Sequence, residues 1–207
     1  MSLKIQSTHR RRPRRSASAN APIAPLVVNS DGTVSQEYSE EERLFFQRWQ
    51  PTTIVSGKNV EESWRISKAI HAFPMQCWFN ARMAIQRLED YAQASYVEGW
   101  AVACDGLMFE HGWLVNDEKI VDPTLPEGIA AYFPGLEFKG RHEIGEFLAT
   151  SLGKACRKSP FLFAFGWGGG QSPTFRAAQE NALAFVQRMF LSGCPHPVSC
   201  SGGAGRP

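Results

Sequence analysis

A cysteine, a histidine and an aspartate follow one another within residues 75–126, in the segments MQCWFNA, FEHGWLV and KIVDPTLP. A thiolate can attack an acyl carbon, a histidine can carry the proton, and a carboxylate can hold the imidazole in the useful tautomer. Cys77, His111 and Asp122 therefore predict a Cys-His-Asp site for acyl transfer, provided that the fold brings the three together.

A helix over about 75–90 is expected to present the cysteine from its first turn. Four residues recur at spacings of four, three and four, and so share one face: Cys77, Ala81, Ala84 and Leu88. The two alanines would let this helix approach a sheet closely. Unpaired backbone N–H groups and the helix dipole favour an anion at a helix start, and these N–H groups could also receive an oxyanion.

Three strands are expected after this helix, at 96–104, 109–115 and 119–122. Asp105-Gly106 is a good hairpin signal between the first two strands. The histidine and the aspartate then belong to neighbouring antiparallel strands.

The turn between the last two strands decides whether His111 and Asp122 share a face. A loop of Asn116 and Asp117 would place them directly opposite, with Cβ atoms about 4.5–5.5 Å apart. A loop of Asp117 and Glu118 would leave them as diagonal neighbours on one face, whereas a three-residue loop would send Asp122 to the other face. Two of the three simplest registers therefore support the site.

One α+β domain is expected over 36–192, with a small antiparallel sheet packed against the helix that begins with the cysteine. Further helices are predicted at 35–49, 60–72, 141–151 and 173–191, and further strands at 131–138 and 161–165. Residues 1–35 are predicted to be a disordered basic tail, and residues 193–207 a flexible C-terminal tail.

Composition is ordinary for a soluble globular protein, at 207 residues with 43% hydrophobic and 20% charged residues. Five cysteines without a CxxC pair favour neither a disulfide framework nor a zinc site, and a reducing compartment is the simpler assumption. No apolar run approaches the roughly 18 residues of a membrane span, and no secretory signal is evident. We therefore expect a cytoplasmic protein without membrane contact, metal or cofactor.

The basic excess is concentrated near the N-terminus, at Arg10, Arg11, Arg12, Arg14 and Arg15. One hypothesis is a weak contact with nucleic acid through phosphate neutralisation. The favoured alternative is a solvated tail, because no aromatic residues alternate with these arginines to stack on bases.

The motifs resemble a known family. Gln76-Cys77-Trp78 followed by Ala81 resembles the active-site helix of transglutaminase-like enzymes, which share the papain-like core of cysteine enzymes. His111-Gly112-Trp113 and Val121-Asp122-Pro123-Thr124 resemble the histidine and aspartate strands of that family. The resemblance covers about a quarter of the chain, and Met75 departs from the glycine that the family often has before Gln-Cys.

This resemblance implies that Cys77 is the nucleophile, His111 the base and Asp122 the residue that orients the base. It implies amide chemistry without a metal, as peptide hydrolysis, glutamine deamidation or acyl transfer to an amine. Some family members use a tryptophan upstream of the cysteine in the oxyanion hole, and the sequence leaves Trp64 and Trp49 as alternatives.

Two further residues are candidates for substrate contact, Glu98 and Trp113, although a structural or surface pairing fits Glu98 equally well. Glu110 is disfavoured as the triad carboxylate because it points to the opposite strand face from His111. The leading hypothesis is a cysteine hydrolase or acyltransferase acting on an amide or thioester of a protein or small molecule. The alternative is a non-catalytic binding protein on the same fold, with its basic tail contacting nucleic acid.

Overall fold

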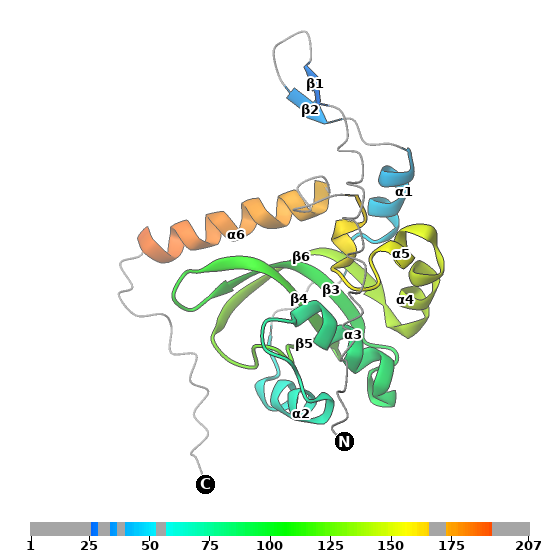
Figure 1. The fold of residues 1–207 in the computed structure, drawn as a ribbon. Helices are drawn as coiled ribbons and strands as arrows, with labels where there is room; N and C mark the ends of the chain where they lie inside the picture. Colours follow the sequence, from blue (N-terminus) through cyan, green and yellow to red (C-terminus); the bar gives the residue numbers. More distant parts are fainter. Residues whose placement is uncertain (1–25, 29–33, 37–39, 53–56, 166–172, 192–207) are drawn as a thin grey trace, which may run out of the picture.

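The computed structural model describes residues 26–28, 34–36, 40–52, 57–165 and 173–191 (Figure 1). The predicted C-terminal tail and most of the predicted basic tail lie outside the described residues. The elements are β1 Leu26–Val28, β2 Val34–Gln36, α1 Glu40–Arg48, α2 Val60–Ile70, α3 Cys77–Arg87, η1 Glu89–Tyr91, β3 Ser95–Ala103, β4 Met108–Asn116, β5 Lys119–Val121, β6 Ile129–Lys139, α4 Gly140–Ala149, α5 Ser151–Ala155, η2 Phe161–Phe165 and α6 Pro173–Leu191.

A four-stranded antiparallel sheet in the order β5-β4-β3-β6 forms the centre of a mixed α+β fold, which confirms the predicted class at that level. Alternate strand residues face opposite sides. Tyr96 and Leu114 join the larger apolar cluster, whereas Val97 and Trp113 join a small cluster on the other face. Figure 1 shows α6 lying across the sheet, and it contacts mainly β6 and β3.

Aromatic rings fill the larger cluster. The Phe138 ring of β6 lies 4.3 Å from Trp49, 5.4 Å from Phe147 and 5.0 Å from Phe161, measured between ring centroids. Aromatic pairs at these separations add to the free energy gained by apolar burial. The end of α1, the helix α4 and the segment η2 are thereby held on the same side of the sheet.

Small residues allow α3 to lie directly on the sheet, as the alanine spacing predicts. Ala81 and Ala84 are completely buried. On the strand side, a Cβ atom added at Gly112 would lie only 2.8 Å from the Trp78 Cα. The first turn of α3 therefore contacts β4 at the residue next to His111.

The turn between β4 and β5 consists of Asp117–Glu118, because Val115 pairs with Ile120. Both turn residues have positive φ, at 47° and 58°, as a two-residue hairpin turn of this kind requires. The directly opposed register is therefore wrong and the diagonal one is correct. His111 and Asp122 lie on the same face of the sheet, offset along the strands.

Two predicted elements differ from the structure, one in its type and one in its starting residue. Residues 161–165 form the 3₁₀ segment η2 rather than a strand, because their first two backbone N–H groups donate to the carboxylate of Glu98 instead of to a sheet edge. The first helix begins at Glu40 rather than at Ser35, and Val34–Gln36 form β2 instead.

The cysteines differ in oxidation state. Cys104 is disulfide-bonded, which departs from the expectation that the cysteine count favours no disulfide framework. Cys77 and Cys156 are free thiols. The predicted nucleophile is therefore not consumed by a disulfide.

Candidate active site

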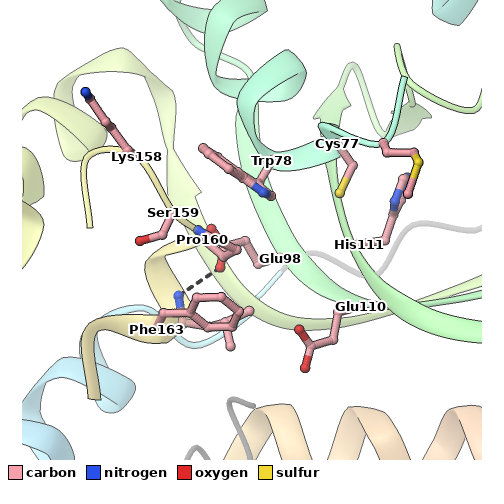
Figure 2. Close-up of a pocket in the computed structure, with 11 residues that line it drawn as sticks. Cys77, Trp78, Glu98, Glu110, His111, Lys158, Ser159, Pro160 and Phe163 are labelled. Carbon is pink, nitrogen blue, oxygen red and sulfur yellow. Dashed lines mark hydrogen bonds between the residues drawn. The ribbon is translucent and has the colours of Figure 1, made fainter. Parts of the chain in front are cut away.

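A cavity of about 420 Å³ opens beside the start of α3, and Figure 2 shows its walls. The first turn of α3 forms one wall, strands β3 and β4 form the second, and the segment 158–163 forms the third. The residues of the first two walls are Met75, Cys77, Trp78, Glu98, Glu110 and His111.

The three predicted triad residues are brought together at this cavity. His111 Nε2 lies 2.8 Å from Asp122 Oδ2, and both residues are buried. Cys77 lines the same cavity as this imidazole and contributes to raising the pKa of His111. Because Asp122 occupies Nε2, Nδ1 is the ring nitrogen that remains for exchange of a proton with the thiol.

The environment of His111 favours the imidazolium. Burial lowers the pKa of His111, but the charge and hydrogen bond of Asp122, with a smaller contribution from Cys77, raise it to about 9. Burial raises the pKa of Asp122, and the attraction of His111 and Lys58 outweighs this and leaves it below its usual value. The pair therefore holds a positive imidazole next to the cysteine at neutral pH.

Asp122 is fixed by several donors besides His111. Its Oδ1 accepts the backbone N–H groups of Thr124 and Leu125, each at 3.0 Å. Its Oδ2 also accepts the Tyr132 hydroxyl at 2.8 Å. A buried carboxylate with this many donors stays ionised and cannot rotate away from the imidazole.

Lys58 and Tyr132 complete this network, and no pattern in the sequence predicts a role for either residue. Lys58 Nζ donates to the Tyr132 hydroxyl at 2.7 Å and lies 3.8 Å from Asp122 Oδ2. Burial lowers the pKa of Lys58 to about 8, although the charges of Asp122 and Glu127 oppose the shift. Lys58 precedes α2 and Tyr132 lies in β6, so only the folded chain brings them to Asp122.

Asn80 connects the start of α3 to the loop that follows Asp122. Its amide oxygen accepts the Phe73 N–H, while its amide nitrogen donates to Phe73 O and to Thr124 Oγ1. Thr124 in turn donates its backbone N–H to Asp122. The positions of Cys77 and Asp122 are therefore linked through one buried amide.

The backbone immediately before the cysteine is unusual. Met75 has a φ of 60° in the left-handed region and is 95% exposed. Glycine adopts this conformation without steric cost, which fits the glycine that the resembled family often has here. The helical hydrogen bonds begin with the Asn80 N–H to Gln76 O, which leaves the N–H groups of the first turn, including that of Cys77, without a helical partner.

Glu98 lines the cavity, but its carboxylate is already occupied. It accepts the Tyr96 hydroxyl, the Phe161 N–H at 2.7 Å and the Leu162 N–H at 2.8 Å, and it is only 1% exposed. Burial raises its pKa, and the three donors oppose the shift. Of the two hypotheses for Glu98, these bonds favour a structural role. The Glu98 oxygens hold η2 at the edge of the cavity.

The predicted tryptophan contacts do not reach the cavity. Trp113 is buried beneath His111, with ring centroids 6.3 Å apart. Trp49 is stacked on Phe138, and Trp64 Nε1 donates to Glu127. Trp78 lines the cavity instead, directly after the cysteine. Trp113, Trp49 and Trp64 are not among the residues that line this cavity.

Glu110 also lines the cavity although it belongs to the opposite pleat of β4 from His111. It pairs with Trp100, whereas His111 pairs with Gly99. Burial raises the pKa of Glu110, with a smaller contribution from the charge of Glu98. Glu110 therefore gives the cavity an acidic side opposite the cysteine, as Figure 2 shows.

The His111 pKa predicts that stability falls as pH rises. The pKa of His111 is about 9 in the folded state and about 6.5 in the unfolded state. Between these two pH values the folded state therefore binds more protons than the unfolded state. Between pH 6.5 and 8 we expect a loss of about 2 kcal/mol in the free energy of unfolding. Above pH 8 the lowered pKa of Lys58 acts in the opposite direction. Urea unfolding at several pH values measures this slope, and His111→Gln should remove it. A wild-type slope of opposite sign in that window would contradict the ion pair.

Known proteins give no further guide to this site: no protein-family model, no curated protein and no solved structure matches the chain. Within the described residues, no group of three His, Cys, Asp or Glu side chains is suited to hold a metal ion. None of the helices in those ranges has the length and hydropathy needed to cross a bilayer.

Proposed function

We propose that this chain is a cysteine-dependent hydrolase or acyltransferase that acts on an amide or thioester through Cys77, His111 and Asp122. We further propose that its core is of the papain-like, transglutaminase-like type, on the strength of the motif resemblance. The observation that carries the proposal is the buried His111–Asp122 pair at 2.8 Å, whose imidazole lines the same cavity as the free thiol of Cys77.

The chemistry follows from the charges at this wall. A thiolate at Cys77 paired with the His111 imidazolium attacks the acyl carbon of the substrate. The negative charge on the acyl oxygen is received by backbone N–H groups of the first turn of α3. When the tetrahedral intermediate collapses, His111 gives its proton to the leaving amine or thiol, and an acyl-cysteine remains.

The second half of the reaction decides between the two activities. His111 Nδ1 removes a proton from water or from an amine, which attacks the acyl-cysteine and releases an acid or a new amide together with the Cys77 thiol. Asp122 stabilises the imidazolium in both halves. A cavity of about 420 Å³ fits a side chain or small acyl group, and a protein or a small molecule can supply it.

An acetyl thioester reporter tests this proposal directly. We expect mass spectrometry of the whole chain to show one added acetyl group, and peptide mapping to locate it at Cys77. Release of acetate in buffer would indicate hydrolysis, and acetylation of an added primary amine would indicate transfer. His111→Ala should abolish the acetylation.

The control is Cys156→Ser, which removes the other free thiol of the described residues and should leave the reaction unchanged. Acetylation of Cys77 that persists in His111→Ala, or that is no faster than acetylation of a free model thiol, would refute the proposal. The non-catalytic binding protein, with its basic tail on nucleic acid, would then be the remaining hypothesis.

A further inference from the structure

A second cavity, of about 240 Å³, lies on the other face of α3 and is rich in arginine. Its lining includes Arg82, Arg87 and Arg157, together with the apolar side chains of Phe79 and Met83. None of its lining residues is an aspartate or a glutamate. Three guanidinium groups around one cavity without a carboxylate produce a strongly positive potential.

Arg82 is the buried arginine of this cavity, and two aromatic rings hold it in place. The residue is only 5% exposed, and its guanidinium carbon lies 4.5 Å from the Trp78 ring and 4.4 Å from the Phe161 ring, measured to the ring centroids. The two rings hold the guanidinium in place through its flat faces. Its N–H donors point outward in the plane of the group, where a planar or tetrahedral oxyanion can meet them in pairs.

Those donors have no protein acceptor in the described part of the chain. The carboxylate that acts electrostatically on Arg82 is Glu98, and the oxygens of Glu98 are taken by Tyr96, Phe161 and Leu162. The donors are also not sealed off, because Trp100 Nε1 is the only completely buried and unpaired side-chain nitrogen or oxygen among the described residues. A buried guanidinium whose N–H donors are open to a cavity can bind an anion there.

We propose that this cavity binds the phosphoryl group of a small molecule, at a site separate from the proposed active site. Three guanidiniums match a doubly charged phosphate better than a singly charged carboxylate, and Arg82 and Arg157 can each donate two hydrogen bonds to it. The volume is below the roughly 300–1,000 Å³ of typical ligand pockets, so the cavity takes the phosphoryl end and the remainder of the ligand lies outside. The site does not depend on the activity of Cys77.

Calorimetric titration of the full chain with inorganic phosphate at low ionic strength tests the proposal. We expect one phosphate site in wild type, and binding about tenfold weaker in Arg87→Ala and in Arg157→Ala. Both residues are exposed, so these variants should keep the fold. Arg82→Lys keeps the charge but loses the planar fork, and it should abolish measurable binding.

Two controls exclude a non-specific effect of charge. Arg188→Ala removes an exposed arginine from α6, and alanine at Arg11, Arg12 and Arg14 reduces the basic N-terminal segment. Neither change should alter the affinity for phosphate. Equal weakening by Arg188→Ala and Arg157→Ala, loss of binding in the N-terminal variant, or acetate binding as tightly as phosphate would each overturn the proposal.

Discussion

Replacing Asp122 with asparagine is expected to slow the alkylation of Cys77 by iodoacetamide about 100-fold at pH 6, the size of effect that a positioned acid–base group supplies. The proposed reaction uses a thiolate at Cys77 beside the His111 imidazolium, and the carboxylate of Asp122 stabilises that imidazolium. Asparagine would present an N–H donor to Nε2 in place of a carboxylate oxygen. The imidazole would then carry its proton on Nδ1, where it could no longer accept the thiol proton.

The pH dependence separates this effect from simple damage to the fold. The part of the pH–rate profile that reports His111 should lie near pH 9 in wild type and move toward pH 6.5 in the variant, because the carboxylate no longer raises the pKa of His111. Asp117→Asn is the matched control, because Asp117 is an exposed residue of the same hairpin. If Asp122→Asn keeps its fold and reacts within threefold of wild type at pH 6, Asp122 does not support the nucleophile.

Replacing Glu98 with alanine is expected to lower the free energy of unfolding by about 3–5 kcal/mol. The change leaves three buried donors without an acceptor: the Tyr96 hydroxyl and the backbone N–H groups of Phe161 and Leu162. Each unpaired buried donor costs roughly 1–3 kcal/mol, partly relieved by water entering from the cavity. Glu98→Gln should cost less, because it keeps one acceptor oxygen but turns a second donor toward the N–H groups of η2.

Glu110→Ala is the control in the same cavity. The carboxylate of Glu110 accepts no hydrogen bond from the described residues. Replacing Glu110 with alanine should therefore change the free energy of unfolding by less than about 1 kcal/mol. Urea unfolding of the two alanine variants under identical conditions measures the difference. Equal stability of both variants would mean that Glu98 does not hold η2. Substrate contact would then be the remaining hypothesis for Glu98.

The sequence alone determined which residue types are available for chemistry and which local elements carry them. Helical periodicity placed Cys77 at the start of α3, and the buried alanines of that helix follow from the same spacing. The turn signal at Asp105-Gly106 predicted the hairpin of β3 and β4. These features depend on neighbours within a few positions along the chain, and local patterns describe such neighbours well.

Only the tertiary structure decided the rest. Hairpin signals allowed more than one register, and the fold selected the turn at Asp117–Glu118. The apolar run 161–165 resembled a buried strand, but the carboxylate of Glu98, more than sixty positions earlier, holds its amides in a 3₁₀ turn. Lys58 and Tyr132 reach Asp122 from distant segments. Such contacts join residues far apart in the chain, and the periodicity of one segment carries no information about them.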